Sequence, residues 1–119
     1  GFDGKGSFPE AVQMMRDAHI ERYHVDFVRL EATYYAKDGS SYQTKMPTDR
    51  TYRISDVFCE ESLINTLRTI QRGEITYPEF IEGATKAGAV SYTVYITGRQ
   101  VPYFGKKGET YVEHFPDSF

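Results

Sequence analysis

Apolar side chains recur at helical spacing in three stretches of the chain. Their three- and four-residue intervals predict a helix over residues 8–19 and another over residues 60–72, which ends at Gly73. A third helix is predicted to begin after Thr76 and to end at Gly88. Each stretch has one apolar face, so each helix is expected to pack against the rest of the protein.

Two of these helices start with the same local sequence. Residues 7–10 read Ser-Phe-Pro-Glu and residues 76–79 read Thr-Tyr-Pro-Glu. In a capping box the first hydroxyl accepts a backbone N–H of the new helix, and the glutamate three residues later reaches back. Ser7 and Thr76 are therefore predicted to be the N-caps.

Alternation of apolar and polar positions predicts strands after the first and third helices. Glycine-containing turns separate most of them, as in Lys37-Asp38-Gly39 and Thr97-Gly98-Arg99. The segment Val28-Arg29-Leu30 has no glycine, so it is either a turn or part of one bent strand. The predicted strands lie near residues 23–27, 31–35, 41–46, 90–96, 101–104 and 110–115.

The chain nearly repeats itself after a shift of 69 positions. Residues 5–47 then align with residues 74–116 without a gap, and ten of the 43 pairs are identical. Capping, core and turn positions coincide in this alignment, for example Tyr23 with Tyr92, which indicates two copies of one structural unit.

The resulting element order is αβββ–α–αβββ. We expect an α+β fold in which an antiparallel sheet carries the helices on one side and a pseudo-twofold axis relates the halves. Residues 1–119 are expected to form a single domain, with residues 48–73 as the linker and helix between the copies. The sheet is either one of six strands or two of three strands in contact.

Composition narrows the range of functions. The net charge is −3 and the charges are mixed, so nucleic acid is an unlikely partner. Cys59 is the only cysteine, which fits a reducing compartment and excludes an internal disulfide. No apolar run is long enough to cross a membrane and the start has no signal-peptide pattern, so we expect a cytoplasmic protein.

Motifs for catalysis or metal binding are missing from the sequence. None of the common nucleophile or phosphate-loop patterns occurs, and the histidines have no ligand spacing. Glu60 and Glu61 follow Cys59, and nearby carboxylates raise the pKa of a thiol. The thiol of Cys59 is therefore not expected to be activated as a nucleophile. No catalytic residue, no metal site and no cofactor is predicted.

Tyrosine is the unusual residue of this chain, with ten copies. Aromatic rings with hydroxyl groups are favoured at protein interfaces. The alternative is that these rings fill the core between sheet and helices. The candidates for partner binding occupy equivalent positions of the two copies: Tyr34, Tyr42, Tyr103 and Tyr111.

Several strings resemble a small bacterial and prophage family, domain of unknown function 1398, whose members are sometimes labelled phage envelope proteins. The resemblance covers nearly the whole chain and implies no activity, cofactor or catalytic residue. The strings that carry it are Ser7-Phe8-Pro9-Glu10-Ala11-Val12, Glu21-Arg22-Tyr23-His24, Asp26-Phe27, Thr33-Tyr34-Tyr35, Ile70-Gln71-Arg72-Gly73-Glu74-Ile75, Tyr103-Phe104-Gly105 and Val112-Glu113-His114-Phe115-Pro116.

Together these observations favour a non-enzymatic binding module. Its partner would be a second copy of the chain or another protein, held by the tyrosine-rich sheet or in the cleft between the two pseudo-symmetric halves. The alternative is an enzyme that acts on a small molecule in a cleft between the two halves.

Overall fold

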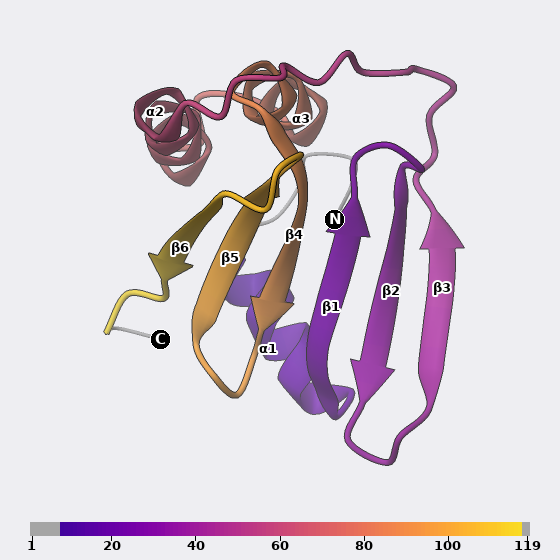
Figure 1. Cartoon of the computed structure of the whole chain (residues 1–119). Coiled ribbons are helices and arrows are strands. Elements are labelled where there is room, and N and C mark those ends of the chain that lie inside the picture. The colour runs from indigo at the N-terminus through magenta and orange to yellow at the C-terminus, as the bar shows by residue number, and fades with distance from the viewer. Residues whose placement is uncertain (1–7, 118–119) are drawn as a thin grey trace.

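A computed structural model describes residues 8–117 of the chain (Figure 1). It has three helices and six strands in an α+β arrangement, in the order α1, β1–β3, α2, α3, β4–β6. The helices are α1 (Phe8–Asp17), α2 (Glu60–Gln71) and α3 (Tyr77–Lys86); the strands are β1 (Ile20–Asp26), β2 (Glu31–Ala36), β3 (Ser41–Lys45), β4 (Ala89–Tyr95), β5 (Gln100–Gly105) and β6 (Thr110–His114).

All six strands form one antiparallel sheet in the order β3-β2-β1-β4-β5-β6. The alternative of two separate three-stranded sheets is therefore wrong. The pairing of β1 with β4 joins the halves, and His24 lies opposite Thr93 in the middle of this pair. The helix α1 lies behind the sheet in the view of Figure 1.

The element order is partly consistent with the expected repeat. The elements α1, β1, β2 and β3 correspond in order to α3, β4, β5 and β6. In each corresponding pair, the first and last residues of the second element lie 69 positions after those of the first. The residues that follow α1 and α3 also share a left-handed backbone, with φ of 59° at His19 and 97° at Gly88.

Several boundaries of helices and strands differ from those predicted. The first helix ends at Asp17 rather than near residue 19, and the first strand covers Ile20–Asp26 rather than 23–27. Residues 27–30 form a turn, so the bent-strand alternative is wrong. Leu30 has the positive φ of 53° that usually calls for glycine, and its side chain is buried in the core.

One face of the sheet packs against the helices and carries the core. Side chains from β1, β4 and β5 meet side chains from all three helices there, in a single cluster. Burying such apolar surface is the main stabilising contribution to the fold. The largest side chains that are fully buried are Val12, Val25, Phe27, Leu63, Thr85 and Val94.

The segment between β3 and α2 crosses the upper edge of the sheet in Figure 1. Its backbone is held by bonds from Ser55 N to Thr85 O and from Cys59 N to Ala87 O. It passes so close to Gly88 that a Cβ there would lie 2.4 Å from the carbonyl oxygen of Val57. Glycine is required at that position for both space and backbone conformation.

The predicted capping box at the start of α3 is confirmed. Glu79 N donates to Thr76 Oγ1, and Thr76 N donates to Glu79 Oε1 over 2.9 Å. The helix ends at the predicted place, with Ala87 as C-cap and Gly88 after it. The matching prediction for Ser7 falls outside the described residues.

Replacing Thr76 by Ala should lower the free energy of unfolding by about 1 kcal/mol, because a helix N–H loses its acceptor. Thermal or urea denaturation of the purified variant measures the change. Thr51→Ala serves as the control, since Thr51 is exposed and caps no helix. Equal stability of the two variants would contradict the capping role.

Candidate functional site

The four candidate tyrosines all lie on the face of the sheet that carries the helices. Each half of the sheet has a row of three tyrosines on three neighbouring strands. The ring centroids lie 5.2 Å apart for Tyr23 and Tyr34 and 5.1 Å apart for Tyr92 and Tyr103. The rows are Tyr42–Tyr34–Tyr23 and Tyr111–Tyr103–Tyr92.

The candidates differ greatly in exposure. Tyr103 is 5% exposed and belongs to the core, whereas Tyr42 is 67% exposed. Tyr34 and Tyr111 are half-buried. Tyr103 therefore fills the core, as the alternative interpretation of these tyrosines expected. Among the four candidates, Tyr42 has the ring that is accessible to a partner.

The helix α2 explains the difference between the two rows. Its Arg68 donates to Glu113 of β6 over 2.5 Å, and the hydroxyl of Tyr111 donates to the same carboxylate over 2.7 Å. This ion pair between α2 and β6 covers the sheet beside the ring of Tyr111. Among the described residues, no helix side chain forms a hydrogen bond or ring contact with Tyr42, whose ring packs on that of Tyr34 with the centroids 6.5 Å apart.

The inner tyrosines are structural groups. The hydroxyls of Tyr77 and Tyr92 lie 2.6 Å apart under α3. Burial raises the pKa of Tyr92, Tyr103 and Tyr23 above the usual value of tyrosine. These hydroxyls therefore stay protonated at physiological pH, so they do not act as bases.

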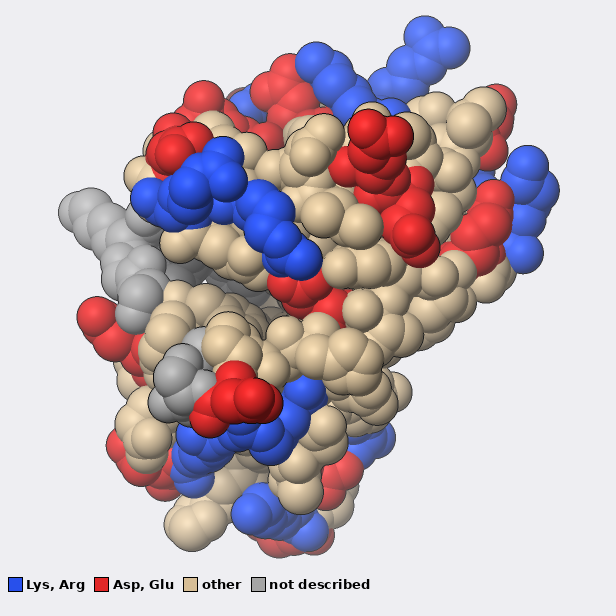
Figure 2. All heavy atoms as spheres, turned by 90° about the vertical axis from the view of Figure 1, so that its left-hand side faces the viewer, with Lys and Arg blue, Asp and Glu red and all other residues tan. Residues whose placement is uncertain are grey.

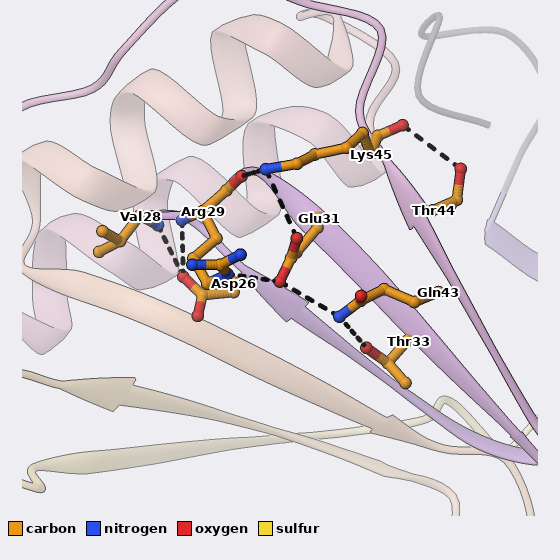
Figure 3. A network of polar contacts seen from close by, with 8 residues as sticks. All are labelled: Asp26, Val28, Arg29, Glu31, Thr33, Gln43, Thr44 and Lys45. Atoms are coloured by element: carbon orange, nitrogen blue, oxygen red, sulfur yellow. Dashed lines mark hydrogen bonds and ion pairs between the residues drawn. The ribbon is translucent and has the colours of Figure 1, made fainter.

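A polar network on the other face of the sheet fixes β3 against β2 (Figure 3). Its centre is Glu31, whose side chain is only 10% exposed. Arg29 Nε donates to this carboxylate over 2.6 Å and Gln43 Nε2 over 3.2 Å, while Lys45 Nζ lies 3.5 Å from its second oxygen.

The same network closes the turn between β1 and β2. The carboxylate of Asp26 accepts the backbone N–H groups of Val28 and Arg29. Lys45 Nζ donates to the carbonyl oxygen of Arg29 over 3.1 Å. Side chains of three consecutive strands thus hold the edge strand β3 in register, which makes it a rigid platform for Tyr42.

Cys59 and His24 each contact a hydroxyl group. The hydroxyl of Ser62 lowers the pKa of the Cys59 thiol, which corrects the expectation of a raised pKa. His24 Nδ1 lies 2.8 Å from Thr93 Oγ1 at the junction of the halves. Within residues 8–117, no three His, Cys, Asp or Glu side chains lie together in a way that could hold a metal ion.

A cavity of 590 Å³ lies between residues 50–57 and α3. Its lining mixes cations with carboxylates: Glu82 lies 3.6 Å from Arg50 Nη2 and 3.3 Å from Lys86 Nζ, and Arg53 and Asp56 line it as well. Neither sign of charge therefore stands alone in this cavity.

Charges of both signs cover the face of the molecule seen in Figure 2, which is the left-hand side of Figure 1. Basic and acidic side chains alternate there, and neither sign forms a continuous field. A strand of nucleic acid would need a continuous basic track. In the described part of the chain, no helix is long and apolar enough to span a membrane.

The fold and these sites define a class: an α+β protein with one six-stranded antiparallel sheet. The chain belongs to the family described as protein of unknown function (DUF1398), which matches residues 3–114. It is 26% identical over 108 residues to uncharacterized proteins of Mycobacterium bovis and Mycobacterium tuberculosis. That alignment covers 91% of this chain and 66% of each relative, so the chain spans just under two thirds of their length.

Replacing Glu31 by Gln should destabilise the protein at neutral pH. The hydrogen bond from Arg29 is the main reason that the pKa of the Glu31 carboxyl lies below its usual value. A lowered pKa in the folded state means that the carboxylate stabilises the fold above the unfolded-state pKa, and that this contribution is lost as the pH falls through the folded-state pKa.

The stability gap between wild type and Glu31→Gln should therefore be largest near pH 7 and should shrink in acid. Urea denaturation at a series of pH values measures it. Asp49→Asn is the control, because Asp49 is exposed and has no hydrogen bond or ion pair with a described residue. A gap that does not change with pH would contradict the role of the carboxylate.

Proposed function

We propose that the protein is a non-enzymatic binding module whose interaction surface is the edge strand β3 with the ring of Tyr42. The observation that carries this proposal is the contrast between Tyr42 and Tyr111. The two occupy matching places on opposite edge strands, yet α2 reaches only Tyr111. A large aromatic side chain that is 67% exposed beside Tyr34 offers rigid contact area to a partner.

The backbone of β3 adds a second binding element. Met46 N donates to Leu30 O, and Ser40 O accepts from Ala36 N, so the even-numbered residues direct their backbone groups toward β2. In an antiparallel strand these directions alternate. The odd-numbered residues from Ser41 to Lys45 therefore direct their backbone N–H and C=O groups toward the open edge, which can receive a further strand. One of these groups, the carbonyl of Lys45, accepts a hydrogen bond from Thr44 Oγ1 over 3.4 Å.

The partner that this edge fits best is a second copy of the chain. Antiparallel pairing of two β3 strands about Gln43 places Ser41 opposite Lys45 and Tyr42 opposite Thr44. No like charges then face each other across the pair, and the exposed Tyr42 ring is brought beside the second subunit. A symmetric dimer of this kind joins the two sheets into one.

We also propose that the two halves are copies of one αβββ unit within a single domain, in the cytoplasm of a bacterium or prophage host. The constant offset of 69 residues between the elements supports the repeat. An enzyme with a cleft between the halves has no such support, because the side chains of Tyr23, Val25 and Tyr92 pack together at the junction on the helix side.

Replacing Gln43 by Pro should abolish dimer formation, because proline removes the central outward N–H of β3. The backbone bonds to β2 stay in place, whereas the side-chain bond from Gln43 to Glu31 is lost. Sedimentation velocity over a range of micromolar concentrations measures the oligomeric state. Tyr42→Ala is a second variant that keeps the backbone intact, and it should weaken the dimer.

Val112→Pro is the matched control, since position 112 lies 69 residues after position 43 and on the opposite edge strand. It should leave the dimer unchanged. A monomeric wild type would contradict the proposal. Loss of the dimer in Val112→Pro alone would assign the contact to β6 instead.

A further inference from the structure

A second cavity, of 350 Å³, lies at the edge of the sheet that is lower in Figure 1. The end of α1, the start of β1, the β2–β3 turn and the β4–β5 turn surround it. Its lining consists of Arg16, Ile20, Lys37, Ile96, Thr97 and Arg99.

Three of these six residues are cations, and no described carboxylate pairs with them. Arg16 is half-buried, and its guanidinium has no hydrogen bond or ion pair with the described residues. The same holds for the ammonium of Lys37. Arg99 donates to the carbonyl oxygen of Pro116 over 3.0 Å and lies over the ring of Phe115, which leaves its charge without an anion.

Neighbouring backbone bonds place these cations together. Lys37 N donates to His19 O, which ties the β2–β3 turn to the end of α1. Arg99 N donates to Tyr95 O and closes the β4–β5 turn. Like charges held together in this way repel one another, so a bound anion would lower the energy of the site.

The opposite edge of the sheet gives an internal comparison, which uses the 69-residue offset of the proposed repeat. Lys106 stands at the position that corresponds to Lys37. Its ammonium donates to the carboxylate of Asp56 over 2.6 Å. The residue that corresponds to Arg16 is Thr85, whose carbonyl accepts Ser55 N of the same segment. At that edge the chain therefore supplies its own anion, and at the edge with Arg16 the described chain supplies none.

We propose that the cavity between Arg16, Lys37 and Arg99 binds a phosphate monoester with a small apolar body. Two guanidinium groups and an ammonium match the two negative charges and the several acceptor oxygens of such a group. Ile20, which is half-buried, and Ile96, which is buried, both line the cavity, so its wall beside the charges is apolar. This site is separate from the edge of β3, and it does not require the dimer.

Titration with phenyl phosphate, followed by the methyl NMR signals of Ile20 and Ile96, tests the proposal. We expect saturable shifts of these two signals, tighter binding than that of inorganic phosphate, and weaker binding as salt is added. Arg16→Gln should weaken binding at least about tenfold, because a charged hydrogen-bond donor is lost. Lys37→Gln should also weaken the binding of phenyl phosphate. Because Lys37 lies at an exposed turn position, this substitution is not expected to disturb the fold.

Arg53→Gln is the matched control, because it removes the same charge from the other cavity. It should bind phenyl phosphate like the wild type. Absence of binding at millimolar concentration would overturn the proposal, as would equal weakening by Arg53→Gln. Tighter binding of phenylacetate than of phenyl phosphate would overturn the assignment to phosphate.

Discussion

The antiparallel pairing of β1 with β4 is the interaction on which the rest of the structure depends. It is the only strand pair in the six-stranded sheet that joins the two halves, through bonds such as Phe27 N to Val90 O and Ile96 N to Glu21 O. The pair also aligns Tyr23 with Val94 and Val25 with Tyr92, so the core of each half is continuous with that of the other. Without this pair, each three-stranded half would expose one side of its core.

The two halves of the sheet differ in how much of their surface is covered, because only one segment connects them and it packs at one end of the sheet. Residues 48–59 and α2 have no counterpart elsewhere in the described chain, and they cover only one end of the sheet. There Arg68 covers Tyr111, and Asp56 neutralises Lys106. At the other end Tyr42 stays exposed and the cations around Arg16 stay unpaired. Both proposed binding surfaces arise from this asymmetry.

The sequence predicted the elements well, because caps and turns are local signals. The capping box at Thr76 marks the start of α3 and Gly88 follows its end, as expected. The turn at residues 27–30 stayed ambiguous, since Leu30 takes the left-handed conformation normally given to glycine. Burial of the Leu30 side chain compensates for that cost, and burial depends on the tertiary fold.

The candidate sites were harder to predict. Tyr42 and Tyr111 lie in the same local pattern, and only the path of α2 makes one exposed and the other covered. The cations of the lower cavity come from α1 and from two separate turns, far apart in the sequence. No spacing rule connects them. Whether six strands form one sheet or two is likewise decided by long-range pairing, which alternation does not encode.

Native-state hydrogen exchange of the backbone amides tests the central role of the β1–β4 pair most directly. If the pair holds both halves in one cooperative unit, the amides of Phe27 and Ile96 exchange only by global unfolding, with the same free energy as the slowest amides of β2 and β5. A lower free energy for all amides of β1–β3 than for those of β4–β6 would contradict the account, because the halves would then unfold separately.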